Sequence, residues 1–317
     1  MNSPTGRTVE ISGKCDAQTA RCTTSTAVAK RLCFGECAHA LKDILLMVEA
    51  RMLFCRPRDE RLSAFVDYIW VSDEQADRPG ERILPNARSQ ILVNLSGNGI
   101  EERSINGTHF HVSGGIVMQG PRKRPVLIAQ SARDALCGIS FKAGGAHFFF
   151  SDAVSSFSDR LIDLDLDWGP TATEFHHKLL ELKSPESRIM LLEATLIARA
   201  CRPLVADRRL NWACHWLGQG MPVHRAAEKL GLNARDMISW FRQRTGLSPK
   251  LYSRICRFQN LITSDADEIR WSHLSDLYGY SDQAHMIRDF REFTGLTPER
   301  YRKANVEWKN HVPEPDL

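Results

Sequence analysis

The sequence lacks the cysteine pairs of a zinc ribbon and the dense framework of a disulfide-stapled domain. Its nine cysteines are odd in number, and none of them form a Cys-x-x-Cys pair. The chain also lacks a secretory signal pattern at its start. We therefore expect reduced thiols and a cytoplasmic protein.

Long hydrophobic runs are also missing. The most apolar stretch near the start, ALKDILLMVEARMLF, is interrupted by four charged residues, which makes it too short and too polar to cross a bilayer. We expect no membrane partner. The apolar residues within this stretch recur at helical spacing and predict one amphipathic helix: Leu41, Ile44, Leu45 and Val48.

Net charge is low, at +4 for the whole chain, and says little about a polyanionic partner. Its distribution is more informative. Residues 203–303 hold 16 Lys and Arg against 11 Asp and Glu, so this segment carries the whole excess of positive charge. A basic terminal domain is compatible with nucleic-acid binding.

A chain of 317 residues has room for about two domains. We predict a leader over 1–51, a β-rich sensor or dimerisation domain over 52–202, an all-α DNA-binding domain over 203–303 and a tail over 304–317. Residues 1 to about 35 of this leader are rich in Ser, Thr, Ala and Gly, and we expect them to be flexible. An alternative is that the natural chain begins at Met47 or Met52.

The middle of the chain has the texture of antiparallel strands joined by tight turns. Short apolar runs are separated by Gly, Pro and Asn: SQILVNLSG, HFHVSGGIVMQ, PVLIAQSA and ALCGISFKAGGA. RLSAFVDYIWV, before them, fits a short helix or a strand, and PTATEFHHKLLELK and SPESRIMLLEATLIARA predict two helices after them. The fold class is therefore α+β, with a β-rich, barrel-like domain followed by a helical one.

The last third of the chain contains a repeat. WFRQRTGLSPKLYSR and DFREFTGLTPERYRK share Phe, Gly, Pro and Tyr at a constant offset of 49 residues. In both copies the glycine can stop one helix, and the Ser-Pro or Thr-Pro that follows can start another. The scaffold residues are Gly246 and Pro249 in the first copy, and Gly295 and Pro298 in the second.

Each copy is preceded by a helix-turn-helix pattern. In the first, a helix begins near Pro222, turns at Gly231 and continues in a second helix capped by Asn233. In the second, the turn falls at Gly279 and Ser281 is expected to cap. A second helix held across the first by a glycine turn is the arrangement that presents a face to the major groove of DNA.

Helical geometry at about 100° per residue separates an inward from an outward face on each second helix. The residues predicted to be inward are Ala234, Met237, Ile238, Phe241, Met286, Ile287 and Phe290. Those predicted to be outward are Arg235, Asp236, Ser239, Ala284, His285 and Arg288. Gln283 lies on the first turn of its helix, the end that usually meets base edges.

Residues from about Leu210 to Lys303 resemble the DNA-binding domain of the AraC/XylS family of bacterial transcription regulators, most closely over GYSDQAHMIRDFREFTGLTPERYR. The resemblance implies two helix-turn-helix units, joined by a helix over about Pro249 to Thr263, that read successive major-groove faces of promoter DNA. It also implies a base-reading arginine two residues before the recognition-helix phenylalanine. Arg288 fills that position in the second unit, whereas the first unit has Ser239.

Under this interpretation Arg235, Ser239, Gln283, His285 and Arg288 read bases. A second group contacts phosphates or positions the helices: Asn233, Arg242, Arg254, Arg257 and Ser281. The expected partners are double-stranded promoter DNA, a small-molecule effector and, for an activator, RNA polymerase, with the protein a monomer or a homodimer.

FKAGGAHFFF resembles the end of the sensor domains in this family, which implies a cupin-like barrel. The pair His109 and His111 could belong to a cupin metal site, but the glutamate that should accompany it is absent, so we predict no metal, no cofactor and no enzyme. The FCRP run at Cys55, with Cys33 and Cys37, resembles the cysteine-rich module of alkyl-phosphotriester repair proteins, although Asp59 stands where a second thiolate is needed. A cupin-type metalloprotein and a DNA-alkylation repair protein are therefore the alternatives.

Overall fold

The structure is a computed structural model that describes residues 47–49, 52–72, 80–96, 99–112, 114–128, 135–264, 277–304, 306 and 309–314. All described residues lie within one compact unit of the chain. Most of the predicted amphipathic helix lies outside the described residues. The prediction of a helix at Val48 is wrong, because Met47–Glu49 form a strand, β1, that pairs with the next strand of the chain.

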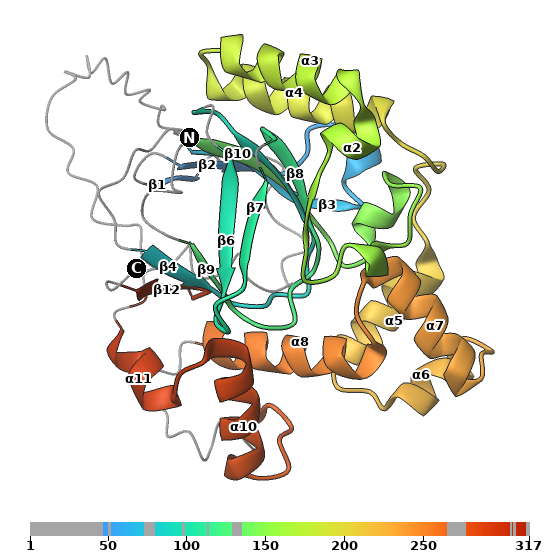
Figure 1. Cartoon of the computed structure of the whole chain (residues 1–317). Coiled ribbons are helices and arrows are strands. Elements are labelled where there is room, and N and C mark those ends of the chain that lie inside the picture. Colours follow the sequence, from blue (N-terminus) through green and yellow to red (C-terminus); the bar gives the residue numbers. More distant parts are fainter. Residues whose placement is uncertain are drawn as a thin grey trace, which may run out of the picture. The chain divides into compact units, whose positions relative to one another are not determined.

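The β-rich domain contains two antiparallel sheets (Figure 1). In the described residues, the larger sheet has the order β1, β2, β3, β10, β5, β8, β11. Its further strands are β2 (Met52–Cys55), β3 (Val66–Ser72), β5 (Gln90–Asn94), β8 (Ile116–Gln119), β10 (Leu136–Phe141) and β11 (Leu161–Asp163). The second sheet has the order β12, β4, β9, β6, β7. Its strands are β4 (Gly80–Ile83), β6 (Ile100–Ser104), β7 (His109–Val112), β9 (Val126–Ile128) and β12 (His311–Glu314).

Helices and short 3-10 turns complete this domain. They are η1 (Glu60–Leu62), η3 (Gly145–Phe148), η4 (Val154–Ser156), α2 (Asp165–Trp168), α3 (Pro170–Glu181) and α4 (Pro185–Ala198). The two helices expected after the strands are confirmed as α3 and α4, and Ser184 caps α4 by accepting a hydrogen bond from the Ser187 amide. The stretch RLSAFVDYIWV, which fitted either a helix or a strand, forms η1 followed by β3.

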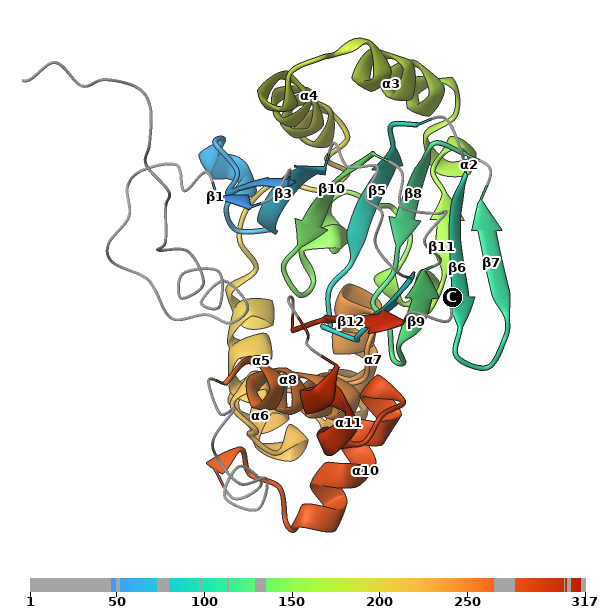
Figure 2. The ribbon, with the colours of Figure 1, turned by 90° about the vertical axis from the view of Figure 1, so that its left-hand side faces the viewer.

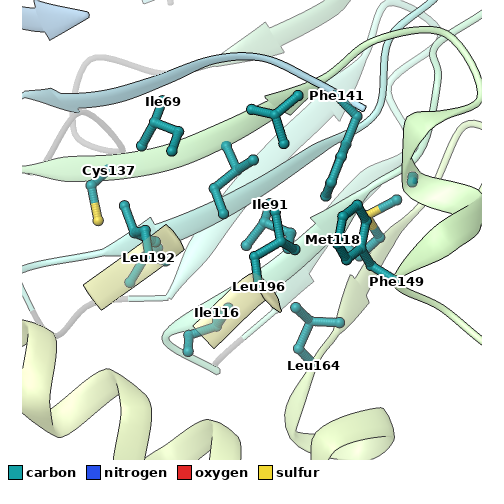
Figure 3. Packing of buried hydrophobic residues seen from close by; sticks show 14 of the residues in the cluster. Ile69, Ile91, Ile116, Met118, Cys137, Phe141, Phe149, Leu164, Leu192 and Leu196 are labelled. Atoms are coloured by element: carbon teal, nitrogen blue, oxygen red, sulfur yellow. The ribbon is translucent and has the colours of Figure 1, made fainter. Parts of the chain in front are cut away.

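The main core of this domain lies between the larger sheet and helices α3 and α4 (Figure 3). Alternate residues of β5, β8 and β10 point into it, including Ile91, Met118 and Cys137, and Leu192 and Leu196 of α4 face them. All five are at most 1% exposed. Full burial of one such side chain stabilises a fold by roughly 1.5–3 kcal/mol, so this layer provides much of the stability of the domain.

A buried polar cluster joins the two sheets. Glu102 of β6 is 1% exposed and accepts hydrogen bonds from Gln119 of β8 and from Arg122. Burial raises the pKa of Glu102, although Arg122 and Gln119 both favour its charged form. The charged sequence IEERS does not predict a strand with a buried face. It forms β6 because its inward carboxylate, Glu102, is paired with Arg122 and Gln119.

The helical domain has a core of its own. Its helices are α5 (Arg208–Gly218), α6 (Val223–Lys229), α7 (Ala234–Thr245), α8 (Pro249–Thr263), α10 (Gln283–Thr294) and α11 (Pro298–Lys303). The connecting helix predicted over Pro249 to Thr263 is confirmed as α8. In Figures 1 and 2, α8 lies between the β-rich domain and α10, and α5, α6 and α7 gather at the other end of α8 from α10 and α11.

The two cores are linked by residues that are distant in sequence. Leu84 and Ala87, which follow β4, are buried in the helical core, as is Val312 of β12. Gln259 of α8 is 0% exposed, and its Nε2 donates to the Pro85 carbonyl at 2.6 Å and to Asn310 Oδ1 at 2.7 Å. Within residues 304–317, predicted to be a tail, His311–Glu314 form β12, which pairs with β4 of the second sheet (Figure 1).

Candidate nucleic-acid interface

The first helix-turn-helix unit has the predicted turn and cap. Gly231 lies between α6 and α7 with φ of 65°, a conformation that favours glycine. The Asn233 side chain caps α7 by accepting from the Asp236 amide at 2.9 Å. Of the second unit, the structure describes the turn, with Gly279 at φ of 70°, and the second helix, α10. The first helix predicted for this unit lies outside the described residues, except for Leu277.

The cap of α10 differs from the prediction. Asp282, and not Ser281, is the N-cap, because its Oδ1 accepts from the His285 amide at 2.6 Å. Ser281 Oγ donates to the other carboxylate oxygen of Asp282 at 3.0 Å. The hydrogen bond from the His285 amide lowers the pKa of Asp282, with a smaller contribution from Ser281. A carboxylate at a helix N-terminus also complements the helix dipole.

Both copies of the repeat end their second helix in the same way. Thr245 and Thr294 are at most 2% exposed. The hydroxyl of each donates to the carbonyl one turn earlier, at 2.9 Å to Phe241 and 2.7 Å to Phe290. The same hydroxyl accepts from the amide two residues later, and the intervening glycine has a left-handed conformation, with φ of 81° at Gly246. The repeated Thr-Gly therefore ends each helix. The sequence predicted this role for the glycine but not for the threonine.

The Phe and Tyr of each copy pack on each other. Phe241 meets Tyr252 edge-on at 5.3 Å between ring centroids, and Phe290 meets Tyr301 at 5.4 Å. Ser248 and Thr297 cap the helices that follow, α8 and α11, which confirms the start expected at each proline. The repeated sequence thus encodes one packing scaffold, used twice.

The outward face of α7 is exposed. Arg235, Asp236 and Ser239 are exposed, as the sequence predicts, and Arg242 is exposed as well. Two residues predicted to be inward are not: Ala234 is exposed, and the Ile238 side chain is 45% exposed. The physical reason is that the buried stripe runs through Met237, Phe241 and Thr245, and Ile238 lies about 60° from its centre, at the edge. Ala234 lies on the first turn of the helix.

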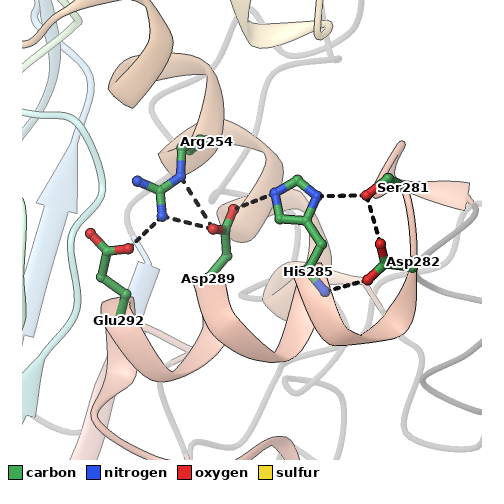
Figure 4. A network of polar contacts seen from close by, with 6 residues as sticks. All are labelled: Arg254, Ser281, Asp282, His285, Asp289 and Glu292. Carbon is green, nitrogen blue, oxygen red and sulfur yellow. Dashed lines mark hydrogen bonds and ion pairs between the residues drawn. The ribbon is translucent and has the colours of Figure 1, made fainter.

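The outward face of α10 keeps Gln283 and Arg288 exposed. The His285 side chain, predicted to point outward, instead contacts residues one turn before and one turn after it (Figure 4). Its Nδ1 lies 3.2 Å from Ser281 Oγ, its Nε2 lies 3.9 Å from Asp289 Oδ2, and its ring meets the edge of the Tyr280 ring.

Arg254, expected at a phosphate, connects α8 to α10 (Figure 4). Its Nη2 lies 2.7 Å from Asp289 Oδ1 and 2.5 Å from Glu292 Oε2, and its guanidinium stacks over the Phe293 ring. Burial alone would lower the pKa of Arg254, but the hydrogen bonds to the two carboxylates outweigh it and raise that pKa. Asp289 is only 3% exposed, so this pair fixes α10 against the connecting helix.

The remaining predicted positioning residue, Arg257, lies over the Tyr280 ring at 5.0 Å. This contact places its guanidinium beside the turn that precedes α10. A cation over an aromatic face contributes about 0.5–1 kcal/mol at an exposed site. Arg257 therefore supports the second unit from α8, as Arg254 does.

The β-rich domain contacts both units. The end of α7 packs against η3 and η4, Ser158 Oγ donates to the Gly246 carbonyl at 2.5 Å, and a side chain at Gly246 would collide with Pro121. Arg82 of β4 donates to the Thr294 carbonyl at the end of α10 at 2.8 Å. The FKAGGAHFFF motif lies at this junction too, because a side chain on Gly144 would meet Leu210 of α5.

The described part of the chain supports neither of the two alternatives, a cupin-type metal site and a cysteine that accepts alkyl groups. His109 and His111 lie on the exposed face of β7, with His109 Nδ1 3.5 Å from a Glu101 carboxylate, and no group of three metal-binding side chains occurs among the described residues. Cys55 is buried, and burial raises the pKa of its thiol to about 11, so it is a poor nucleophile. Cys33 and Cys37 lie outside the described residues.

Within the described segments, no helix is long and apolar enough to cross a membrane. Residues 226–304 match the family model described as a helix-turn-helix domain. Residues 56–163 match that of a domain of unknown function, DUF6597. No curated protein matches the sequence.

Similar solved structures include ToxT from Vibrio cholerae O395, at 9% identity and a TM-score of 0.39, covering 72% of this chain and 95% of that one. ToxT from that strain bound to (E)-4-(8-methylnaphthalen-1-yl)but-3-enoic acid has 10% identity and a TM-score of 0.40, covering 72% and 96%. Unsaturated fatty acid bound ToxT from Vibrio cholerae strain SCE256 has 9% identity and a TM-score of 0.39, covering 71% and 91%. Likenesses this distant do not identify a ligand.

The helix-turn-helix match extends from within α6 to the end of α11, across the two scaffolds described above. The C-terminal domain is therefore an AraC-type helix-turn-helix domain, as the resemblance in the sequence implied.

Proposed function

We propose that α7 and α10 enter successive major-groove segments of one promoter site. The observation that carries the proposal is the repeated scaffold at the two ends of α8, with an exposed, arginine-bearing face on each second helix. At a rise of about 1.5 Å per residue, the 15 residues of α8 span about 22 Å. With the widths of the flanking helices added, this approaches the roughly 34 Å repeat of the groove.

Arg288 and Gln283 are the base-reading residues that we propose for the second unit, and Arg235 and Ser239 those for the first. The Arg288 fork suits the two acceptors of a guanine edge, and the Gln283 amide suits adenine. Arg242 is suited to a phosphate. His285 would read a base only after giving up its contacts with Ser281 and Asp289.

The test is an anisotropy titration against a site selected from random DNA with the full chain. Arg288→Ala should lose about 1–3 kcal/mol of discrimination at one base pair of the site. Arg225→Ala is the matched control, since Arg225 is also an exposed arginine, with a side chain 65% exposed, and lies on α6 rather than on α7 or α10. If Arg288→Ala binds the selected site and its mutated versions like the parent protein, α10 is not the reading helix.

We also propose that the β-rich domain modulates this binding, in response to a small-molecule effector or through dimerisation. Support comes from its contacts with both units, at Gly246 through Ser158 and at Thr294 through Arg82. Arg82→Ala should weaken binding to the full site more than binding to the α7 half alone, because Arg82 contacts the end of α10. Equal effects on both would mean that this contact does not set the spacing of the units.

A further inference from the structure

Ile238 is an apolar residue at the edge of the polar face that we propose for DNA reading. Arg235, Ser239 and Arg242 share its side of α7, at three residues before, one after and four after. All three are exposed, and the Ile238 side chain is itself 45% exposed. Along the helix axis, Ile238 thus lies between two arginines, each about one helical turn away.

The repeat provides an internal comparison. The position equivalent to Ile238, 49 residues later, is Ile287 of α10, which is partly buried and packs against the helical core. Ile238 is absent from that core. The same amino acid at the same scaffold position therefore serves packing in the second unit and is left uncovered in the first.

The next position differs in a complementary way. The second unit has Arg288, a long side chain with a fork of donors, and the first has Ser239, which is short. A short side chain leaves the neighbouring Ile238 unshielded. The second unit thus combines a packed isoleucine with a long donor, and the first combines an uncovered isoleucine with a short hydroxyl.

A single exposed isoleucine is ordinary on a protein surface. Ile238 differs from the others in its position, on one of the two helices proposed to contact DNA. The other large exposed hydrophobic residues of the described chain lie outside α7 and α10: Leu166, Met190, Val205, Trp212 and Leu277. Of the four bases, thymine alone offers a methyl group in the major groove, and apolar side chains recognise it there. The flanking arginines complement phosphates on either side.

We propose that Ile238 reads the 5-methyl group of one thymine in the DNA segment contacted by α7. The inference rests on the proposed entry of α7 into a major groove. It deepens that function by assigning the first unit an apolar mode of recognition, in place of the arginine fork that the second unit uses. Ile238 is a specificity-determining residue, and Arg235 and Arg242 hold it against the groove.

The experiment removes only the methyl group. A site is selected with the full chain, and each of its thymines is replaced in turn by deoxyuridine, which keeps every hydrogen-bonding group. We expect one position in the α7 segment to weaken binding about fourfold, the value expected for one buried methyl. Substitutions in the α10 segment should leave affinity unchanged.

Two variants connect the effect to the residue. Ile238→Ala should bind the thymine and deoxyuridine versions of the site equally, with the affinity of the parent protein for the deoxyuridine version. Val205→Ala is the matched control, because it shortens a β-branched side chain that is 71% exposed and lies before α5, outside both reading helices. This control should keep the full sensitivity to the methyl group.

The outcomes separate the inference from the proposed function. Failure to select any specific site would refute the proposed function itself. Specific binding that depends on Arg288 but tolerates deoxyuridine throughout the α7 segment would overturn the inference alone. The inference also fails if Ile238→Ala retains the methyl sensitivity of the parent protein.

Discussion

The ion pair between α8 and α10 gives the sharpest stability prediction. Arg254→Met keeps an unbranched apolar stem over Phe293 but removes the guanidinium from Asp289 and Glu292. Asp289 is 3% exposed, so its carboxylate would be left buried with only His285, at 3.9 Å, nearby. Removing one partner of a fully buried pair costs about 3–5 kcal/mol. Because the Arg254 side chain is 25% exposed, we expect about 2–3 kcal/mol.

Urea unfolding of the full chain measures this loss. Arg225→Met is the matched control, because Arg225 and its partner Glu228 are each more than 60% exposed, and the change should cost under about 0.5 kcal/mol. A double variant, Arg254→Met with Asp289→Leu, should recover most of the loss, since it removes the uncompensated charge. The reasoning is refuted if Arg254→Met costs no more than the control, or if the double variant is less stable than Arg254→Met alone.

Three further predictions concern the rest of the fold. Burial, with the nearby cation of Arg202, lowers the pKa of half-buried His147 to about 4. The free energy of unfolding should therefore fall by about 1–2 kcal/mol, after discounting for solvent screening, as the pH drops from about 6.5 to about 4. His147→Gln should abolish this loss in urea titrations. Leu84→Ala should cost about 2–5 kcal/mol and speed hydrogen exchange in α8, whereas Leu166→Ala, at an 86% exposed side chain, should do neither. At neutral pH, Cys55 should resist iodoacetamide while exposed Cys201 reacts, as peptide mass spectrometry would reveal; rapid modification of Cys55 would contradict its burial.

Much of the helical domain could be predicted from the sequence, because its signals are local. A glycine at positive φ, an Asn cap and a Ser-Pro start each depend on a few neighbouring residues, and all were found where expected. The errors arose where two local rules competed. Ser281 and Asp282 can both cap a helix, and only the backbone path shows that Asp282 does. Ile238 lies at the edge of a helical face, where the angle alone does not determine burial.

The sequence predicted a β-rich domain but not the order of its strands in the sheets, because each strand pairs with residues that are distant in sequence. The apolar runs of β5, β8 and β10 are visible in the sequence, whereas β6 and β12 carry charged residues and were missed. In β6, the inward Glu102 is compensated by Arg122 and Gln119, a pairing that the sequence does not reveal.

The link between the domains could not be predicted at all, and it bears most on regulation. Arg82 of β4 binds Glu314 of β12 with its Nε at 2.8 Å and the Thr294 carbonyl with its Nη1 at 2.8 Å. One guanidinium thus joins β4 of the β-rich domain, β12 and the C-terminal end of α10. The shared Thr hydrogen bonds and Phe–Tyr contacts of the repeat stabilise each helix-turn-helix unit internally. The contacts of Arg82, Ser158 and Gln259, which lie outside the repeat or on its connecting helix, are the ones through which a change in the β-rich domain would reach either unit.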